Sequence, residues 1–144
     1  MKPNNIKNHE QLLNSLEDMS WQDFEVFVGK IFEFHNYRVE VNKVICYETT
    51  KHQYDVIAQK EHSTILADCK KWDNKRRIKH GLKRAAEKQI ERVKKMNLKN
   101  RYPMIVTSGE SPIELYQKVP IVPIQKLNYF LTHFNRFKSK VTRI

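Results

Sequence analysis

The sequence predicts one α/β domain of 144 residues, built on a mixed β-sheet that has helices on both sides. Three observations lead to this prediction. Segments with a helical hydrophobic repeat alternate with short β-branched runs along the chain. Two of these runs, 54–59 and 64–70, are apolar on both faces, which is typical of central strands. Hydrophobic residues make up 40% of the chain and charged residues 30%, as in folded proteins.

The N-terminal part is expected to be helical. Residues 9–18 place three leucines at helical spacing, and a second helix is expected over residues 21–35. Ser20 with Asp23 three positions later gives the second helix a capping-box-like start. Its buried stripe should comprise Trp21, Phe24, Val28, Ile31, Phe32 and His35.

Glu25 interrupts this stripe. It faces the same way as Val28 and Phe32, and neither residue four positions away is a cation. A carboxylate on an apolar face is costly to bury without a partner. Glu25 therefore either reaches water at the margin of the stripe or joins a polar site as a third acid.

Three strands should follow. Residues 37–44 alternate and are rich in β-branched side chains. After a polar loop at 48–52, the runs 54–59 and 64–70 form a hairpin with residues 60–63 as its turn.

Asp55 and Asp68 lie directly opposite each other in this hairpin. Opposed Cβ atoms are about 4.5–5.5 Å apart, so two like charges there are destabilising unless a cation or a proton lies between them. Lys70 points to the same face as Asp68, whereas Cys69 is a small core residue. Two acids and a lysine on one face of a buried hairpin predict a metal-dependent site that acts on phosphate. The alternative is a structural Asp68–Lys70 contact on a solvated face.

A basic loop at 70–77 should lead into a helix over 78–96. The buried stripe of that helix would be Ile78, Leu82, Ala85, Ala86, Gln89, Ile90, Val93 and Met96. Gln89 is the polar member, and the outward face is almost wholly Lys and Arg.

The C-terminal part is expected to add two strands and two helices. Residues 104–107 read as a buried strand, and 111–114 as a helix start with a cap, a proline and an acid. The strand at 119–124 should be at an edge because it contains two prolines. A last helix covers 125–137, with Phe130 and Phe134 on a surface that could mediate dimerisation.

We expect a single domain at 1–144. It consists of a helical extension at 1–19, a core at 20–137 and a frayed basic tail at 138–144. No apolar run approaches the roughly 20 residues of a membrane span, and no secretion signal is evident. Two cysteines are too few for a disulfide framework, so a cytoplasmic protein is expected.

The positive charge is concentrated after the acid pair. The net charge is +11, and residues 70–101 hold 14 Lys and Arg against 3 acids, a surplus of 11. Such concentration favours nucleic-acid binding over a merely solvated helix face. The six histidines lack zinc-ligand spacing, and the chain has no glycine-rich phosphate loop for a nucleotide.

Phosphodiester hydrolysis would suit these residues. Mg²⁺, for which Mn²⁺ could substitute, is typically held by one or two carboxylates, here Asp55 and Asp68, and the Cys69 carbonyl could complete the site. Lys70 could orient the attacking water or stabilise charge. Glu25 could bind the metal through water or hold a second metal, and Gln89 could contact a phosphate or a water.

The pattern Asp55 followed by Asp68-Cys69-Lys70 resembles the restriction-endonuclease-like, or PD-(D/E)xK, nuclease superfamily. The order of elements is similar from residue 20 to residue 137. The phrases Phe24-Glu25 and Asp68-Cys69-Lys70-Lys71-Trp72 look most like Mrr-type endonuclease domains and archaeal Holliday junction resolvases. Tyr54 replaces the proline of the superfamily name, Asp68 stands where Glu or Gln is usual, and a glycine before the first acid is missing.

The resemblance implies a restriction-endonuclease-like three-layer fold and a Mg²⁺-dependent DNA endonuclease of restriction or junction-resolving type. It implies metal ligation by Asp55 and Asp68, a catalytic Lys70, a supporting Glu25, and Gln89 beside the site. The expected partners are duplex or branched DNA and a second copy of the chain in a homodimer. The residues expected to contact DNA are Lys71, Trp72, Lys75, Arg76, Arg77, Lys79, Lys83 and Arg84. The alternative is an inactive DNA-binding module that keeps the fold.

Overall fold

The computed structural model describes residues 19–71, 78–96, 99–141 and 143. The predicted helix at 9–18 therefore lies outside the described residues, as does the basic loop from 72 to 77. The described elements are α2 (Trp21–Phe34), β1 (Arg38–Tyr47), β2 (Thr50–Lys60), β3 (Ser63–Lys70), α3 (Ile78–Lys94), β4 (Arg101–Thr107), β5 (Leu115–Tyr116), β6 (Val119–Pro123), α4 (Ile124–Thr132), α5 (Phe134–Phe137) and the 3₁₀ helix η2 (Lys138–Lys140).

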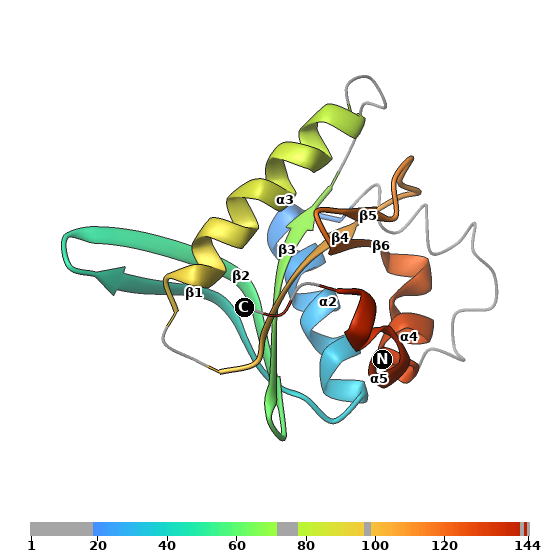
Figure 1. Cartoon of the computed structure of the whole chain (residues 1–144), viewed down its shortest axis with the longest axis horizontal. Coiled ribbons are helices and arrows are strands. Elements are labelled where there is room, and N and C mark those ends of the chain that lie inside the picture. Colours follow the sequence, from blue (N-terminus) through green and yellow to red (C-terminus); the bar gives the residue numbers. More distant parts are fainter. Residues whose placement is uncertain (1–18, 72–77, 97–98, 142, 144) are drawn as a thin grey trace.

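The strands form one mixed sheet in the order β1-β2-β3-β4-β6-β5 (Figure 1). β1, β2 and β3 form an antiparallel meander, whereas β3, β4 and β6 are parallel. The pairs of the β2–β3 hairpin run from Val56↔Ala67 to Lys60↔Ser63, which is the predicted register. Glu61, in the two-residue turn, has a φ of 53°.

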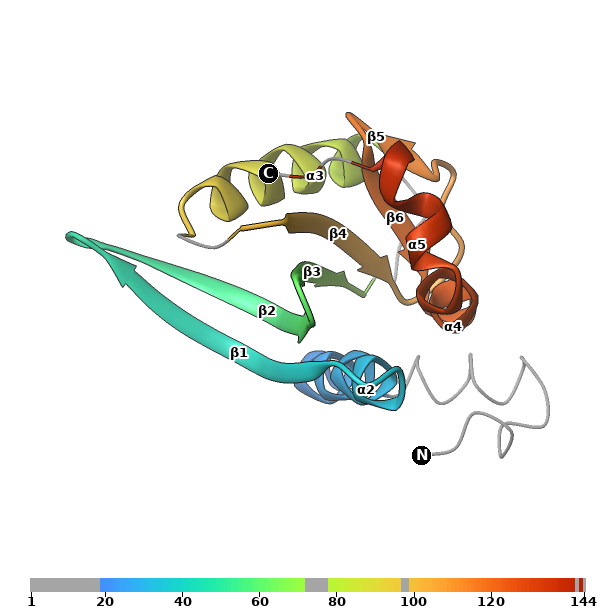
Figure 2. The same ribbon diagram turned by 60° about the horizontal axis from the view of Figure 1, so that its bottom comes forward.

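Helices cover both faces of the sheet, so the fold is a three-layer α/β arrangement (Figure 2). On one face, α2 and α4 share a core with strand residues that include Ala67 and Val106. On the other face, α3 buries Leu82 against Ile105 and Val93 against Leu66. The sheet is thus apolar on both sides, as predicted for its central strands.

The N-terminus of α2 forms as its sequence predicts. The Ser20 hydroxyl accepts a hydrogen bond from the Asp23 amide at 3.1 Å, which satisfies one of the free amides of the first turn. Phe24, Val28 and Phe32 are buried. Trp21 is 51% exposed, contrary to the prediction, because helical side chains tilt toward the N-terminus and Trp21 is the first residue of the helix.

The predicted loop at 48–52 is mostly strand. β2 already begins at Thr50, and Glu48 makes the turn from β1 with a φ of 55°. As a result, β1 and β2 form a long hairpin arm that extends beyond the rest of the sheet (Figures 1 and 2).

The helix predicted from 111–114 is wrong. Ser111 accepts a hydrogen bond from the Ile113 amide, two residues on, and the chain then forms the short strand β5. Gln117 and Lys118 turn β5 into β6 with φ values of 48° and 63°. Pro120 follows too soon for a helix, because proline removes an amide donor and clashes with the preceding turn.

The edge position predicted for the strand at 119–124 is also wrong, because β6 lies between β4 and β5. Its prolines are tolerated because the two neighbours pair with different parts of it. β5 pairs only with Val119 and Pro120, whereas β4 pairs from Ile121 to Pro123. Each proline therefore stands at the end of a ladder, where a missing amide costs little.

The last helix divides into α4 and α5 at His133. Phe134 is 5% exposed and belongs to the core, while Phe130 is half-buried against that core. Phe134 therefore does not belong to the predicted apolar dimerisation surface, and only part of Phe130 is exposed. Val141 in the predicted frayed tail is likewise buried against the core. No helix in the described part of the chain is long and apolar enough to cross a membrane.

Candidate active site

Asp55 lies where β2 separates from β3. The β2–β3 pairs end at Val56↔Ala67, and one further step in this register puts Asp55 opposite Asp68. In β1, Asn42 faces this position with a φ of 57°, so the backbone bends where the arm leaves the sheet. Asp55 Oδ2 accepts a hydrogen bond from the Cys69 amide at 2.8 Å. The fork between the strands thus directs the Asp55 carboxylate at the end of β3.

Asp68 is buried and has two cationic partners. Lys70 Nζ lies 3.2 Å from its Oδ2, and Nη1 of Arg92, in α3, lies 3.6 Å from its Oδ1. The side chain of Asp68 is only 6% exposed, whereas those of Lys70 and Arg92 are each about one-third exposed. The Asp68–Lys70 contact therefore exists, but its carboxylate is buried rather than on a solvated face.

Glu25 brings a third acid from α2. It is 3% exposed, so it does not reach water at the margin of the helix. Burial raises the pKa of Glu25, and the negative charge of Asp68 raises it further. The structure therefore places Glu25 within electrostatic range of the pair, as the sharper of the two sequence interpretations requires.

The environment of Asp55 favours its protonated form. Burial, followed by the charge of Asp68, raises the pKa of Asp55 from 3.8 to about 7. A hydrogen bond with Asp68 and the charge of Glu25 act in the same direction, while the Cys69 amide opposes them. Three acids in one buried region need a proton or a cation to neutralise them. Strongly raised pKa values of this kind are typical of functional sites.

Two further predicted residues are buried beside the pair. Gln89 in α3 is 2% exposed, and its Nε2 donates a hydrogen bond to the Leu66 carbonyl at 2.7 Å. Cys69 is 1% exposed, and burial raises the pKa of its thiol. This keeps the thiol protonated, so Cys69 is a core residue rather than a nucleophile.

Sequence reasoning missed Arg92. It was counted only as part of the basic outer face of α3. Because residues three apart in a helix lie on neighbouring positions, Arg92 follows Gln89 on the side that faces β3. Its spacing from Gln89, which was already expected beside the site, was the available signal.

The donors fit a hard divalent cation. Asp55 and Asp68 offer carboxylate oxygens, and Mg²⁺ is held by one or two carboxylates with several waters. Glu25 is not gathered with them into a tight cluster. Within the described ranges, no group of three or more His, Cys, Asp or Glu side chains could hold a metal ion. A metal held here would therefore depend on this pair and on water.

The predicted DNA-contacting residues are only partly described. Lys71 Nζ donates to the Met19 carbonyl at 2.5 Å, which ties the end of β3 to the start of α2. Lys79 and Arg84 are exposed on α3, and Lys83 lies over the Tyr116 ring. Trp72, Lys75, Arg76 and Arg77 lie outside the described residues.

Comparisons with known proteins identify the family of this chain. The family model Mrr_cat, described as a restriction endonuclease, matches residues 16–110, which is more than half of the chain. An uncharacterized protein of Archaeoglobus fulgidus is 29% identical over 125 residues, covering 85% of this chain and 97% of that protein.

Two solved structures share the fold. The crystal structure of AF1548, a protein of unknown function, matches with a TM-score of 0.51 and 16% sequence identity. The match covers 61% of this chain and 47% of AF1548, so this chain spans about half the length of AF1548. The small subunit of the heterodimeric restriction endonuclease R.BspD6I also matches with a TM-score of 0.51, at 14% sequence identity. This match covers 86% of this chain and 77% of the subunit. The three-layer α/β fold is therefore restriction-endonuclease-like.

Proposed function

The chain belongs to the restriction endonuclease family matched over residues 16–110, and on that premise we propose that it is a Mg²⁺-dependent DNA endonuclease that hydrolyses phosphodiester bonds. The observation that carries the proposal is the buried acid pair at the strand fork. Burial, together with the charge of Asp68, raises the pKa of Asp55 to about 7, and Lys70 contacts Asp68 at 3.2 Å.

Each residue has a distinct part in this proposal. Asp55 and Asp68 would hold the metal, with the Cys69 carbonyl beside them, and Mn²⁺ could take the place of Mg²⁺. The bound metal would supply a Lewis acid for the phosphate and lower the pKa of a bound water. Lys70 would orient the attacking water or stabilise the charge that develops on the phosphate. Glu25 would hold a water near the metal.

Gln89 has a positioning part. Its hydrogen bond to the Leu66 carbonyl ties α3 to β3 two residues before Asp68. This contact fixes the helix against the strand that carries Asp68 and Lys70. We therefore assign Gln89 to the placement of these groups.

The substrate we propose is duplex or branched DNA, cut in the manner of a restriction enzyme or a junction-resolving enzyme. Either reaction severs two strands, which calls for two active sites related by a two-fold axis. A homodimer would supply them. Size-exclusion chromatography with light scattering, with and without DNA, tests this arrangement.

Cleavage assays test the proposed function. Supercoiled plasmid and a four-way junction are incubated with the protein and Mg²⁺ or Mn²⁺. Lys70→Ala should lower the cleavage rate by about 100-fold or more, as does loss of one charge-stabilising donor in other enzymes, while DNA binding is kept. Lys43→Ala is a matched control, since Lys43 forms an exposed ion pair with Glu40 in β1. It should leave the rate unchanged.

Two results would count against the proposal. Undiminished cleavage by Lys70→Ala or Asp68→Ala would show that the reaction takes place elsewhere. No cleavage of either substrate by the wild-type chain, with DNA binding retained, would favour the inactive DNA-binding module. The preference between the two substrates separates the restriction and junction-resolving alternatives.

A further inference from the structure

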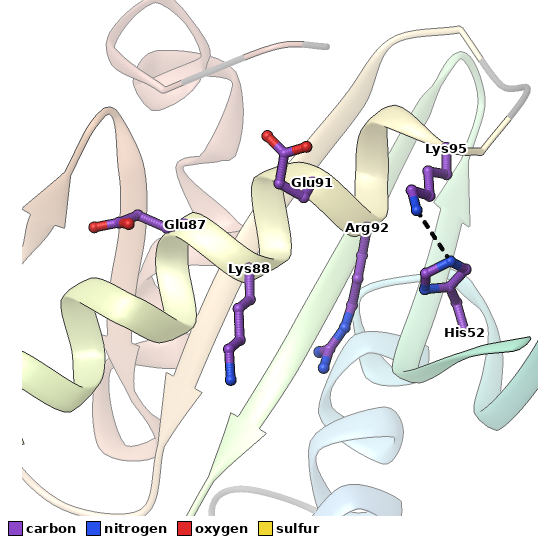
Figure 3. Close-up of a pocket in the computed structure, with 6 residues that line it drawn as sticks. All are labelled: His52, Glu87, Lys88, Glu91, Arg92 and Lys95. Atoms are coloured by element: carbon purple, nitrogen blue, oxygen red, sulfur yellow. Dashed lines mark hydrogen bonds between the residues drawn. The ribbon is translucent and has the colours of Figure 1, made fainter. Parts of the chain in front are cut away.

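A groove next to the acid pair shares only Arg92 with the site described above. It has a volume of about 310 Å³ and lies between α3 and the start of β2 (Figure 3). Its lining residues are His52, Glu87, Lys88, Glu91, Arg92 and Lys95. Four come from α3, Lys95 lies in the turn directly after α3, and His52 comes from the hairpin arm. The groove therefore joins two elements that meet beside the strand fork.

The cations of the groove follow one side of α3. Lys88 and Arg92 are four residues apart in α3, and Lys95, three residues further on, lies in the turn that continues the helix, so the three cations form a row. Figure 3 shows Lys88 and Arg92 extending to the same side, and Lys95 reaching toward His52. The Nζ atom of Lys95 lies 3.4 Å from Nε2 of His52. At 1.5 Å per residue the row covers about 10 Å of the helix axis.

The two acids of the groove are turned to other partners. Glu87 Oε1 accepts a hydrogen bond from the Tyr116 hydroxyl at 3.1 Å, on the β5 side of α3. Glu91 forms an exposed ion pair with Lys94 at 3.6 Å. Figure 3 shows both carboxylates pointing away from Lys88 and Arg92. Neither groove acid therefore neutralises the row, in which Arg92 is paired with Asp68.

Arg92 connects this row to the acid pair. Its guanidinium lies 3.6 Å from Asp68 and its side chain is 35% exposed, so one side of it contacts the buried acid while the other faces solvent. The helix end that carries it is anchored, because the Tyr54 hydroxyl donates to the Arg92 carbonyl at 2.8 Å. Arg101 Nη1 donates a hydrogen bond to the Val93 carbonyl, one residue further along the helix, at 2.8 Å.

We propose that this groove binds the DNA backbone next to the phosphate that is cut, with Lys88, Arg92 and Lys95 each facing one phosphate. The inference rests on the proposed function in taking DNA as its ligand. Single-strand phosphates advance about 3.4 Å along a duplex axis, so a row of about 10 Å spans about three of them. Cations that reach solvent along this side suit phosphates, because such contacts need charge rather than base-specific geometry.

The size of the effect follows from counterion release. The logarithm of the binding constant falls with the logarithm of the salt concentration, with a slope of about −0.9 per phosphate contact. Two contacts therefore contribute about 30-fold in affinity at 0.15 M salt, relative to 1 M salt. Lys88→Gln combined with Lys95→Gln should weaken binding by about this factor. The slope of log affinity against log salt should become shallower by about 1.8.

The experiment measures binding of a fluorescein-labelled 30-base-pair duplex by anisotropy, in EDTA to prevent cleavage, across a salt series. The double variant is compared with wild type and with Lys94→Gln, which removes a cation from the same helix on the side that faces Glu91. All three substituted lysines are partly or fully exposed, and a circular dichroism melt confirms that each variant is folded.

A shallower slope and weaker binding for the double variant, with Lys94→Gln close to wild type, would support the groove. Wild-type affinity in the double variant, or an equal loss in Lys94→Gln, would overturn it. The result is independent of cleavage. A chain that cuts no DNA but loses binding on Lys88→Gln with Lys95→Gln would refute the endonuclease and leave the groove assignment standing.

Discussion

Replacing Asp55 with Asn should stabilise the protein at alkaline pH while it removes the proposed metal ligand. The Asp55 carboxyl is 8% exposed, and burial beside Asp68 raises its pKa from 3.8 to about 7. Between these two values the folded chain holds a proton that the unfolded chain has released. The free energy of unfolding should therefore fall as pH rises from about 4 to about 7, with the penalty fully present above pH 7.

The magnitude follows from the same two pKa values. One pKa unit corresponds to about 1.4 kcal/mol, so the penalty at pH 8 is at most about 4 kcal/mol. An Asn side chain keeps an oxygen for the Cys69 amide and offers its NH₂ group to Asp68, so it retains both contacts without the charge. Asp55→Asn should thus raise the melting temperature by about 3 °C for each kcal/mol recovered.

The assay is urea unfolding followed by circular dichroism at pH 5 and pH 8 in EDTA. Wild type should lose stability between the two pH values, whereas Asp55→Asn should lose much less. Asp68→Asn is the contrasting control, because it weakens the contacts with Lys70 and Arg92 and should destabilise at pH 8. A wild-type stability that does not fall between pH 5 and pH 8, or an Asp55→Asn variant less stable than wild type at pH 8, would refute this reasoning.

Two other substitutions test the packing that positions the site. Gly29→Ala should destabilise the fold by about 1–3 kcal/mol in urea unfolding, because a Cβ there would lie 2.9 Å from Val41 Cγ2 and 3.2 Å from Val39 Cγ1; unchanged stability would mean that β1 shifts freely against α2. Tyr54→Phe should cost about 1 kcal/mol in the same assay, because the Arg92 carbonyl loses its hydroxyl donor; no loss would mean that water replaces the hydroxyl.

The hairpin that carries the two acids could be predicted from the sequence alone, including its register. Its register depends on a short turn and on strands that are apolar on both faces, and both features are local. A one-residue slip would have moved Asp68 to the opposite face, so the observed pairing of Ala67 with Val56 confirms the basis of the prediction. The buried face of α3 was predictable for the same reason, because its 3.6-residue repeat is regular.

The errors arose where the outcome depends on distant partners. Residues 111–114 have a good helix start, but Pro120 and the pairing of Ile121 with Ile105 draw the segment into the sheet. Strand neighbours of this kind are not encoded in local propensity. The contact of Arg92 with Asp68 joins α3 to β3 across residues 72–77, which lie outside the described residues. The spacing of Arg92 from Gln89 indicates its side of the helix, but local pattern alone does not show that this side meets Asp68.

The two acids of the pair are unequal, and this inequality determines how a metal would bind. Asp68 has two cationic partners, Lys70 and Arg92, whereas Asp55 accepts a hydrogen bond from the neutral amide of Cys69. A proton shared by the pair should therefore reside on Asp55, whose pKa is raised to about 7. Because a metal requires its carboxylate ligands to be ionised, binding must displace this proton. Affinity for Mg²⁺ should then fall as pH drops below about 7, a range in which ordinary surface carboxylates remain fully ionised.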